Sequence, residues 1–310
     1  MPKTQLWIAL LLLVFAACAS PAGQDAGDGR LRVVATTGMI GDLAARLGGE
    51  HVQVRTLMGP GVDPHLYKAS ESDVRALAEA GLVLYNGLHL EGKMGDVLVK
   101  LARTRPVLAV TEDLPRDALR EPPEFAGQYD PHVWFDVSLW AKTVGPVERE
   151  LARLDPEHAA DYARRRAELE AELSALDAWV AERIATIPER QRVLVTAHDA
   201  FGYFGRRYGM RVVGLQGIST LAEAGLSDVE RVVREILDAR VPAIFVESSV
   251  PRKSIEAVQA AVAARGFQVL IGGQLHSDAL GAAGSPAGTY VGMVRTNVDT
   301  IVTALSGGPS

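Results

Sequence analysis

The chain has 310 residues, of which 48% are hydrophobic and 23% are charged. This balance is typical of globular proteins and excludes a collagen-like or disordered chain, and the length allows two domains. Acidic residues outnumber basic ones by 38 to 32, which gives a formal charge of −6 and disfavours a nucleic-acid partner. Cys18 is the single cysteine, so an internal disulfide and a cysteine-based zinc cluster are both excluded.

Residues 1–18 have the features of a secretory signal with a lipidation site. Lys3 precedes an apolar stretch at 6–17, which is too short to cross a bilayer core of about 30 Å as a helix. Small residues then lead to Cys18, as in a bacterial lipobox, and a plain signal peptide is the alternative. We expect export to the periplasm or the outer face of the cytoplasmic membrane, a lipid on Cys18, and a flexible tether at 19–30.

Short apolar strands alternate with helical stretches in two series along the remaining chain. The strands of the first series are predicted at 31–37, 52–58, 81–87 and 105–111. Helices are predicted between them at 39–47 and 70–80. The strands of the second series are predicted at 192–198, 210–216, 241–247 and 267–273. This alternation predicts an α/β fold with two lobes, at 31–145 and 189–310, each with a small parallel sheet flanked by helices.

A linking region at 146–188 contains one long predicted helix, 157–187, which Pro156 and Pro188 bracket. Its apolar side chains recur at spacings of three, four and seven residues, which places them on one helical face. They are Tyr162, Leu169, Leu173, Leu176, Val180, Ile184 and Ile187. At 1.5 Å per residue the helix would be about 46 Å long. It could form a coiled-coil arm, but its position between two α/β halves favours a stiff connector that packs along both.

The tripeptide Asp-Pro-His occurs twice, at Asp63–His65 and at Asp130–His132. Proline fixes its own φ and makes the preceding residue extended, so each histidine is presented from a constrained turn. The aspartates, Asp63 and Asp130, could accept a hydrogen bond nearby. The repetition raises both histidines above the ordinary expectation that a single histidine is a surface or packing residue.

Two further candidate ligands follow predicted strands of the second half. His198 ends the strand at 192–198, and Asp278 lies in the loop after the strand at 267–273. Ligands of open parallel sheets bind at the carboxyl ends of the strands, so these residues could meet the motif histidines in a cleft. His276 is the main competitor for the role of Asp278. Asp199 and Glu247 could orient the histidines, or could serve as a helix cap or a salt-bridge partner.

Imidazoles combined with one carboxylate suit a divalent first-row metal. Zinc would take four such ligands in a nearly tetrahedral shell, whereas manganese usually prefers more oxygen. His51, His89 and His158 carry no repeated motif and are expected to be solvated.

The chain resembles the metal-binding receptors of bacterial ABC importers, the group with a helical backbone that takes up zinc, manganese or iron. The matching stretches are VVATTGMIGDLA (33–44), GVDPHLYKASESDV (61–74), YDPHVWFDV (129–137), TAHDAFGYFGRRYG (196–209), QGISTLAEAGLSD (216–228), IFVESSV (244–250) and the loop to Asp278. Carried over residue by residue, the metal positions of the family fall on His65, His132, His198 and Asp278. The resemblance also implies a metal between two lobes, delivery to an ABC permease with a cytoplasmic ATPase, and a monomer.

Two details bear on the metal. Many manganese or iron receptors of the family have a glutamate where this chain has His198, which favours zinc. Many zinc receptors carry a histidine-rich loop before the second motif histidine, whereas residues 112–129 contain no histidine. With three histidines and one aspartate as ligands, the chain resembles a subgroup of the family that handles both zinc and manganese. We expect zinc first, manganese as the alternative and iron(II) third.

The expected mechanism is capture by neutral imidazoles and an ionised Asp278, with affinity falling as the pH drops through about 6.5. The long helix should keep the closing motion small. No enzymatic activity is expected, because a zinc hydrolase needs an open coordination position for water. A surface adhesin would need an exposed apolar patch, and a metal-chelate receptor a larger aromatic pocket; an aromatic content of 6% supports neither.

Overall fold

The computed structural model describes residues 29–125 and 127–307. The predicted signal segment, Cys18 and residues 19–28 of the predicted tether lie outside the described residues. None of the helices within the described ranges combines the length and the apolar character that a bilayer crossing requires.

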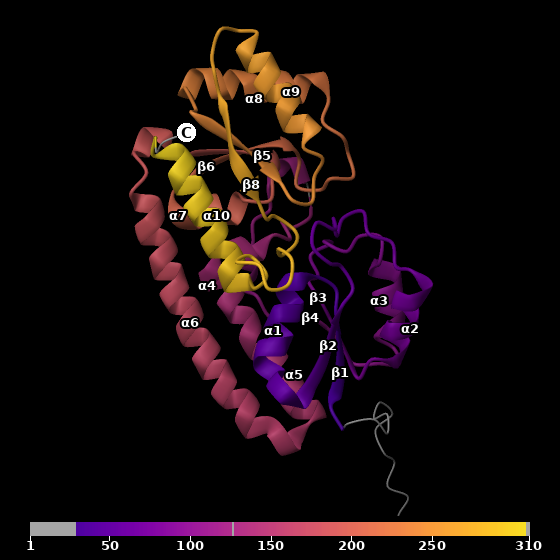
Figure 1. Ribbon diagram of the computed structural model, residues 1–310. Coiled ribbons are helices and arrows are strands. Elements are labelled where there is room, and N and C mark those ends of the chain that lie inside the picture. Colours follow the sequence, from indigo (N-terminus) through magenta and orange to yellow (C-terminus); the bar gives the residue numbers. More distant parts are fainter. Residues whose placement is uncertain (1–28, 126, 308–310) are drawn as a thin grey trace, which may run out of the picture.

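The N-terminal lobe contains a parallel four-stranded sheet in the order β2–β1–β3–β4. The strands are β1 (Leu31–Ala35), β2 (Val52–Thr56), β3 (Leu82–Tyr85) and β4 (Val107–Ala109). Helix α1 (Gly38–Gly48) covers one face, while α2 (Glu71–Glu79) and α3 (Gly95–Leu101) cover the other (Figure 1). Neighbouring strand residues point to opposite faces: Val33 joins the core under α1, and Val34 packs in the cluster of α2 and α3.

The C-terminal lobe contains two parallel strand pairs. In the first pair β5 (Val193–His198) lies beside β6 (Arg211–Gln216), and in the second β7 (Ala243–Glu247) lies beside β8 (Leu270–Leu275). Strand β5 contacts β7, so the two pairs are neighbours. Helix α7 (Gly202–Tyr208) follows β5, and helices α8 (Leu226–Ala239) and α9 (Lys253–Ala263) pack together on the outer side of the lobe (Figure 1).

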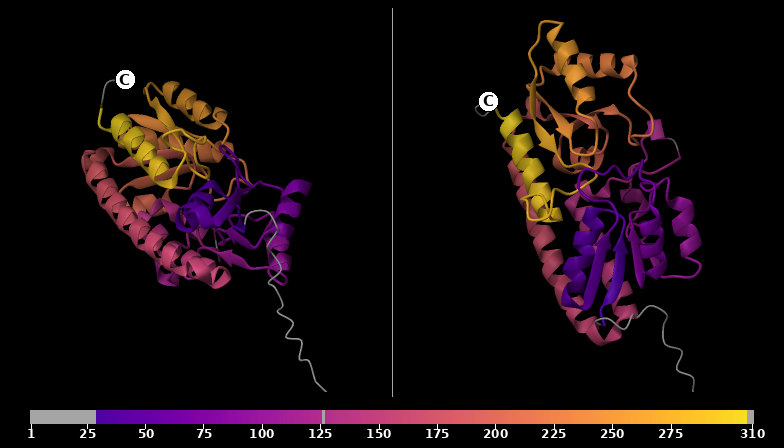
Figure 2. Two further views of the ribbon diagram at one scale, coloured as in Figure 1. Left: turned by 60° about the horizontal axis from the view of Figure 1, so that its bottom comes forward. Right: turned by 45° about the vertical axis from the view of Figure 1, so that its right-hand side comes forward.

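The predicted long helix is α6 (Ala159–Ala185), which runs along one side of both lobes (Figures 1 and 2). The short helices α4 (Val137–Trp140) and α5 (Val144–Leu154) lead into it from the N-terminal lobe. All seven apolar positions predicted from its spacing are buried, from Tyr162 to Ile187. The prediction of a connector packed along both halves is therefore confirmed. It begins two residues later than predicted, after a 3₁₀ turn at Pro156–His158, and ends two residues earlier.

The last helix, α10 (Tyr290–Leu305), returns along α6 and contacts β8 and α1 as well. Because of this arrangement one apolar core is shared by the two lobes: it includes Leu84 and Leu43 of the N-terminal lobe, Leu176 of α6, and Phe245 and Ile301 of the C-terminal part. A second cluster under α8 and α9 belongs to the C-terminal lobe alone. The lobes are thus joined by a continuous apolar core along α6 and α10.

Candidate metal centre

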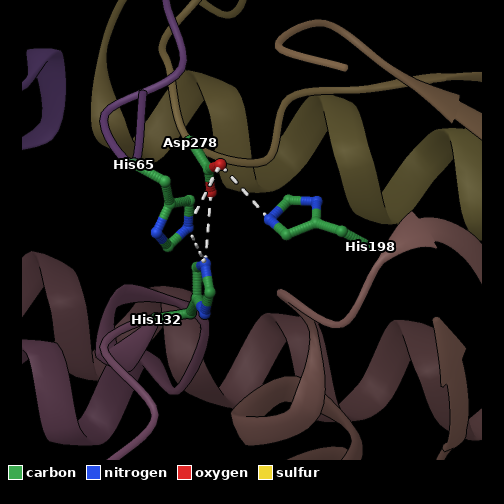
Figure 3. Close-up of side chains that lie close together, drawn as sticks. All are labelled: His65, His132, His198 and Asp278. Carbon is green, nitrogen blue, oxygen red and sulfur yellow. Dashed lines mark hydrogen bonds and ion pairs between the residues drawn. The ribbon is translucent and has the colours of Figure 1, made fainter. Parts of the chain in front are cut away.

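The four candidate ligands meet between the two lobes (Figure 3). His65 comes from the loop between β2 and α2, and His132 directly precedes a 3₁₀ turn at Val133–Phe135. His198 is the last residue of β5, and Asp278 lies three residues beyond β8. One nitrogen or oxygen atom from each residue lies within 4.8 Å of the others, and all four residues are buried. The structure thus brings together the four residues that were expected to meet in a cleft.

The spacing of the ligand atoms matches a compact coordination shell. His132 Nε2 is 3.3 Å from His65 Nε2 and 3.4 Å from Asp278 Oδ1. Asp278 Oδ2 is 3.2 Å from His198 Nε2 and 3.9 Å from His65 Nε2. Zinc bonds of about 2.0–2.2 Å in a tetrahedron put neighbouring ligand atoms about 3.3–3.6 Å apart. The shorter separations equal those of a tetrahedral zinc shell, and the wider ones, up to 4.8 Å, would have to contract around the ion.

Several of these atoms have no hydrogen-bond partner although they are buried. Among the described residues, His198 Nε2 and both carboxylate oxygens of Asp278 have none. Their charged contacts, at 3.2 and 3.4 Å, are to other members of the same cluster. A buried polar atom without a good hydrogen bond costs about 1–3 kcal/mol, so its presence calls for an explanation. A bound cation would satisfy all three atoms at once, so the donor set suits a metal.

Both Asp-Pro-His motifs form the constrained turn expected from the sequence. The backbone N–H of His65 donates to Asp63 Oδ1 over 2.8 Å, and that of His132 donates to Asp130 Oδ1 over 3.0 Å. Each aspartate therefore fixes the backbone from which its own histidine projects. Pro64 and Pro131 stiffen the turns further because their φ angles are fixed.

Carboxylates also orient two of the three imidazole rings. His132 Nδ1 lies 2.8 Å from Asp130 Oδ1, and His198 Nδ1 lies 2.6 Å from Glu247 Oε2. A ring held through Nδ1 turns its Nε2 toward the common centre. The orienting role considered for Glu247 thus has a geometric basis, and Asp130 accepts the hydrogen bond expected of it. Among the described residues, no hydrogen bond joins the Asp199 side chain to a histidine.

The His132 turn has supports that the sequence did not reveal. Arg120 forms an ion pair with Asp130, and the Tyr203 hydroxyl donates to the carbonyl of Asp130. Asn86 donates to the carbonyl of Pro131 over 3.1 Å. The position of Asn86 at the end of β3 is a signal that could have identified it, whereas Arg120 and Tyr203 carry none. The Arg120 side chain crosses Gly202, where a Cβ atom would collide with its guanidinium group.

The remaining histidines lie outside the centre. His276, the competitor of Asp278, exchanges hydrogen bonds between its backbone and the side chain of Asn297. His89 is exposed, as expected. His51 and His158 are only partly exposed, because their rings stack with centroids 3.7 Å apart; the expectation that both are simply solvated was wrong.

The protonation states of the four side chains are unequal. Burial lowers the pKa of His65 to about 3. Burial also opposes a charge on His132, but its hydrogen bond to Asp130 and the nearby Asp278 outweigh that effect and raise its pKa to about 9. For His198 burial acts in the same way, and Glu247 and Asp278 raise its pKa well above the ordinary value. Burial opposes the charge of Asp278, yet His198 and His132 hold its pKa well below the ordinary value. Without a metal, the carboxylate is therefore ionised beside two protonated rings.

Comparisons with known proteins identify the family of the chain. The family model described as "Zinc-uptake complex component A periplasmic" matches residues 33–304. The zinc-binding protein TroA of Treponema pallidum is 50% identical over 284 residues, which cover 91% of each chain. The manganese-binding lipoprotein MntA of Bacillus subtilis is 47% identical over 302 residues, which cover 97% of this chain and 98% of that one. The solved structure of TroA superposes with a TM-score of 0.88 at 49% identity over 90% of this chain and 100% of that chain. The chain described above therefore belongs to the family of periplasmic zinc-uptake component A proteins.

Proposed function

We propose that the protein is an extracytoplasmic receptor that binds one divalent transition metal ion and delivers it to an ABC permease. The ligands in this proposal are His65, His132, His198 and Asp278. The observation that carries it is the convergence of three buried imidazoles and one buried carboxylate, with one nitrogen or oxygen atom of each within 4.8 Å of the others. The metal is the cargo, so it has to be bound firmly in the closed site and released on the permease.

Zinc is the proposed cargo, because three imidazoles and one carboxylate complete a tetrahedral shell at the observed spacing. Manganese is the alternative, since Asp278 presents both oxygens to the centre and manganese favours a larger share of oxygen ligands. Relatives named for each metal match this chain almost equally well. Iron(II) is the third candidate.

We further propose that the mature protein is exported and held to the membrane by a lipid on Cys18, followed by the tether at 19–30. The sequence before Cys18 supports this, and the Bacillus subtilis relative carries the name of a lipoprotein. The proposed division of the chain remains an N-terminal lobe at 31–145, a linking region at 146–188 and a C-terminal lobe at 189–310. We propose a monomer as the binding unit, because both halves of the site come from one chain.

A receptor fits the site better than a hydrolase does. A catalytic zinc site has three protein ligands and an open position for water. Here four protein side chains converge, and none of them is more than 3% exposed. Substrate would have no access to the ion in this arrangement.

The proposal is tested by metal binding to the mature protein and to four alanine variants, at His65, His132, His198 and Asp278. Each loses a direct metal bond and should bind zinc at least about a hundredfold more weakly, measured by competition with a chelator. His276→Ala is the matched control, since it removes a nearby histidine that lies outside the cluster. Unchanged affinity in the four variants would refute the assignment.

The cargo itself is identified by elemental analysis of the protein purified from its own cells. Zinc in the native protein, and zinc retained against excess manganese, would support the first choice. Manganese in the native protein would support the alternative, even if zinc binds more tightly in vitro.

A further inference from the structure

The two Asp-Pro-His turns use their aspartates differently. In both, one carboxylate oxygen accepts the backbone N–H of the histidine. In the second motif the other oxygen pairs with Arg120, which belongs to the same lobe. In the first motif the other oxygen, Asp63 Oδ2, accepts the Thr220 hydroxyl over 2.6 Å. Thr220 belongs to the C-terminal lobe, so this bond crosses the cleft.

Thr220 stands out in its own loop, which connects β6 to α8. It is 7% exposed, whereas the next residue, Leu221, is 59% exposed. The loop is braced to its own lobe, because Gln216 donates to the carbonyl of Ala222. Thr220 is therefore a buried polar side chain that moves with the C-terminal lobe and contacts the N-terminal lobe.

The three histidine rings differ in whether a carboxylate contacts the ring itself. Carboxylates lie within hydrogen-bond distance of Nδ1 of His132 and of His198, whereas Asp63 bonds to the backbone of His65. The support of the His65 turn thus depends on an aspartate that is itself shared with the opposite lobe. Separation of the lobes would remove the Thr220 bond from the Asp63 carboxylate, whereas the Asp130 carboxylate would keep its bond to Arg120 within the N-terminal lobe. The Tyr203 hydroxyl also bonds to the second motif across the lobes, but it bonds to the backbone carbonyl of Asp130 and not to the carboxylate.

We propose that Thr220 is a positioning residue for cargo retention: it holds Asp63, and through it His65, only while the lobes are closed. His65 is then the ligand that is freed first when the lobes part. This inference rests on the proposed function, because it assigns a role to Thr220 at the same metal site. It predicts that the Thr220 hydroxyl slows release of the metal without affecting its capture.

The test compares Thr220→Val, which keeps the shape and removes the hydroxyl, with the wild-type mature protein. Zinc is loaded alone, and its release into a chromophoric chelator is followed by stopped flow. We expect dissociation about tenfold faster, the change that about 1.4 kcal/mol produces, with an unchanged association rate. Thr220→Ser should restore slow release, which a purely structural role for the side chain would not predict.

Ser219→Ala is the matched control, because the Ser219 hydroxyl accepts a bond from Leu221 N within the same loop. It should release zinc at the wild-type rate. Thr220→Ala carries the same expectation as Thr220→Val and serves as the second variant if the valine protein does not fold.

The outcomes separate this inference from the proposed function. If wild-type protein holds no zinc, or if His65→Ala binds as tightly as wild type, the proposed function fails. If wild type binds zinc and His65→Ala does not, but the Thr220 variants that fold release it at the wild-type rate, the inference alone is overturned. Faster release in Ser219→Ala as well would also overturn it, because the effect would then belong to the loop as a whole.

Discussion

The buried charges at the centre couple metal binding to the release of protons. Asp278 is held ionised by its two protonated neighbours, His132 and His198. A divalent cation supplies the same positive charge from a single point, so binding displaces the protons from the rings. His65 needs no such exchange, because burial lowers its pKa to about 3 and it is neutral at physiological pH. Two of the three imidazoles therefore have to lose a proton before they bind a metal, which differs from the expectation that all three are neutral.

These pKa shifts predict that rising pH lowers the stability of the metal-free protein and raises its affinity for zinc. The pKa of His132 is raised from 6.5 to about 9, so its contribution to metal-free stability is complete below 6.5 and is lost as the pH rises through 9. The loss is roughly 3 kcal/mol at most. Zinc affinity should rise over the same interval, because fewer protons compete. The competition window therefore lies higher than the value of about 6.5 expected from an unperturbed histidine.

Thermal unfolding at pH 6.5, 7.5 and 9, with and without zinc, checks both effects. The metal-free midpoint should fall with rising pH, and the shift produced by a fixed free zinc concentration should grow. The raised pKa of His132 would be contradicted by a flat or rising metal-free midpoint.

The carboxylate of Glu247 holds His198 in place, and its removal should weaken zinc binding. Glu247 binds both the backbone N–H and the ring Nδ1 of His198, so Glu247→Gln should weaken zinc binding by about 10–100-fold. Asp199→Asn is the paired control, since the Asp199 side chain has no hydrogen bond to a histidine in the described part of the chain; it should stay within about threefold of wild type. Competition with a chelator measures the zinc affinity of both variants. Equal losses of affinity would contradict the assignment of the orienting role to Glu247 and not to Asp199.

Among the elements, α6 shows why periodicity is the most informative signal in this sequence. Its apolar residues follow one face for about six turns, from Tyr162 to Ile184. No glycine or proline lies between Pro156 and Pro188. Such a stripe has to be buried against a partner, and both lobes supply one. Strand positions were predicted as well, but their limits moved: the last strand was expected at 267–273 and lies at Leu270–Leu275. A short apolar run predicts a strand, but it does not determine at which residue the hydrogen bonds to the neighbouring strand begin.

The buried face of helix α6 should contribute strongly to the stability of the fold. Leu176 is 1% exposed within the shared core, so Leu176→Ala should lower the free energy of unfolding by about 2–5 kcal/mol. Ser174, two residues earlier, is exposed, and Ser174→Ala should change it by no more than about 0.5 kcal/mol. Denaturant unfolding of both metal-free variants measures the difference. Similar losses for the two would show that the stripe does not stabilise the fold.

In the molecule as a whole, the sequence identified those ligands that a local motif or a strand end marks. The repeated motif singled out His65 and His132, and the strand end singled out His198. The choice between His276 and Asp278 depended on the family resemblance, since both follow β8 and only the direction of each side chain separates them. The bonds of Arg120 to Asp130 and of Thr220 to Asp63 were not predictable, because each joins segments whose relative placement is decided by the packing of the complete chain.

The core that α6 and α10 share with both lobes has a consequence for engineering. Hybrids between relatives named for different metals would show which part of the chain determines the metal that is bound, and the obvious cut would fall in the middle of the chain. Such a cut would separate Leu43 and Leu84 from Ile301 and Phe245, which occupy one core. A workable hybrid should instead take both long helices from the same parent as the lobe surfaces that they cover, and exchange only the short segments that carry the ligands.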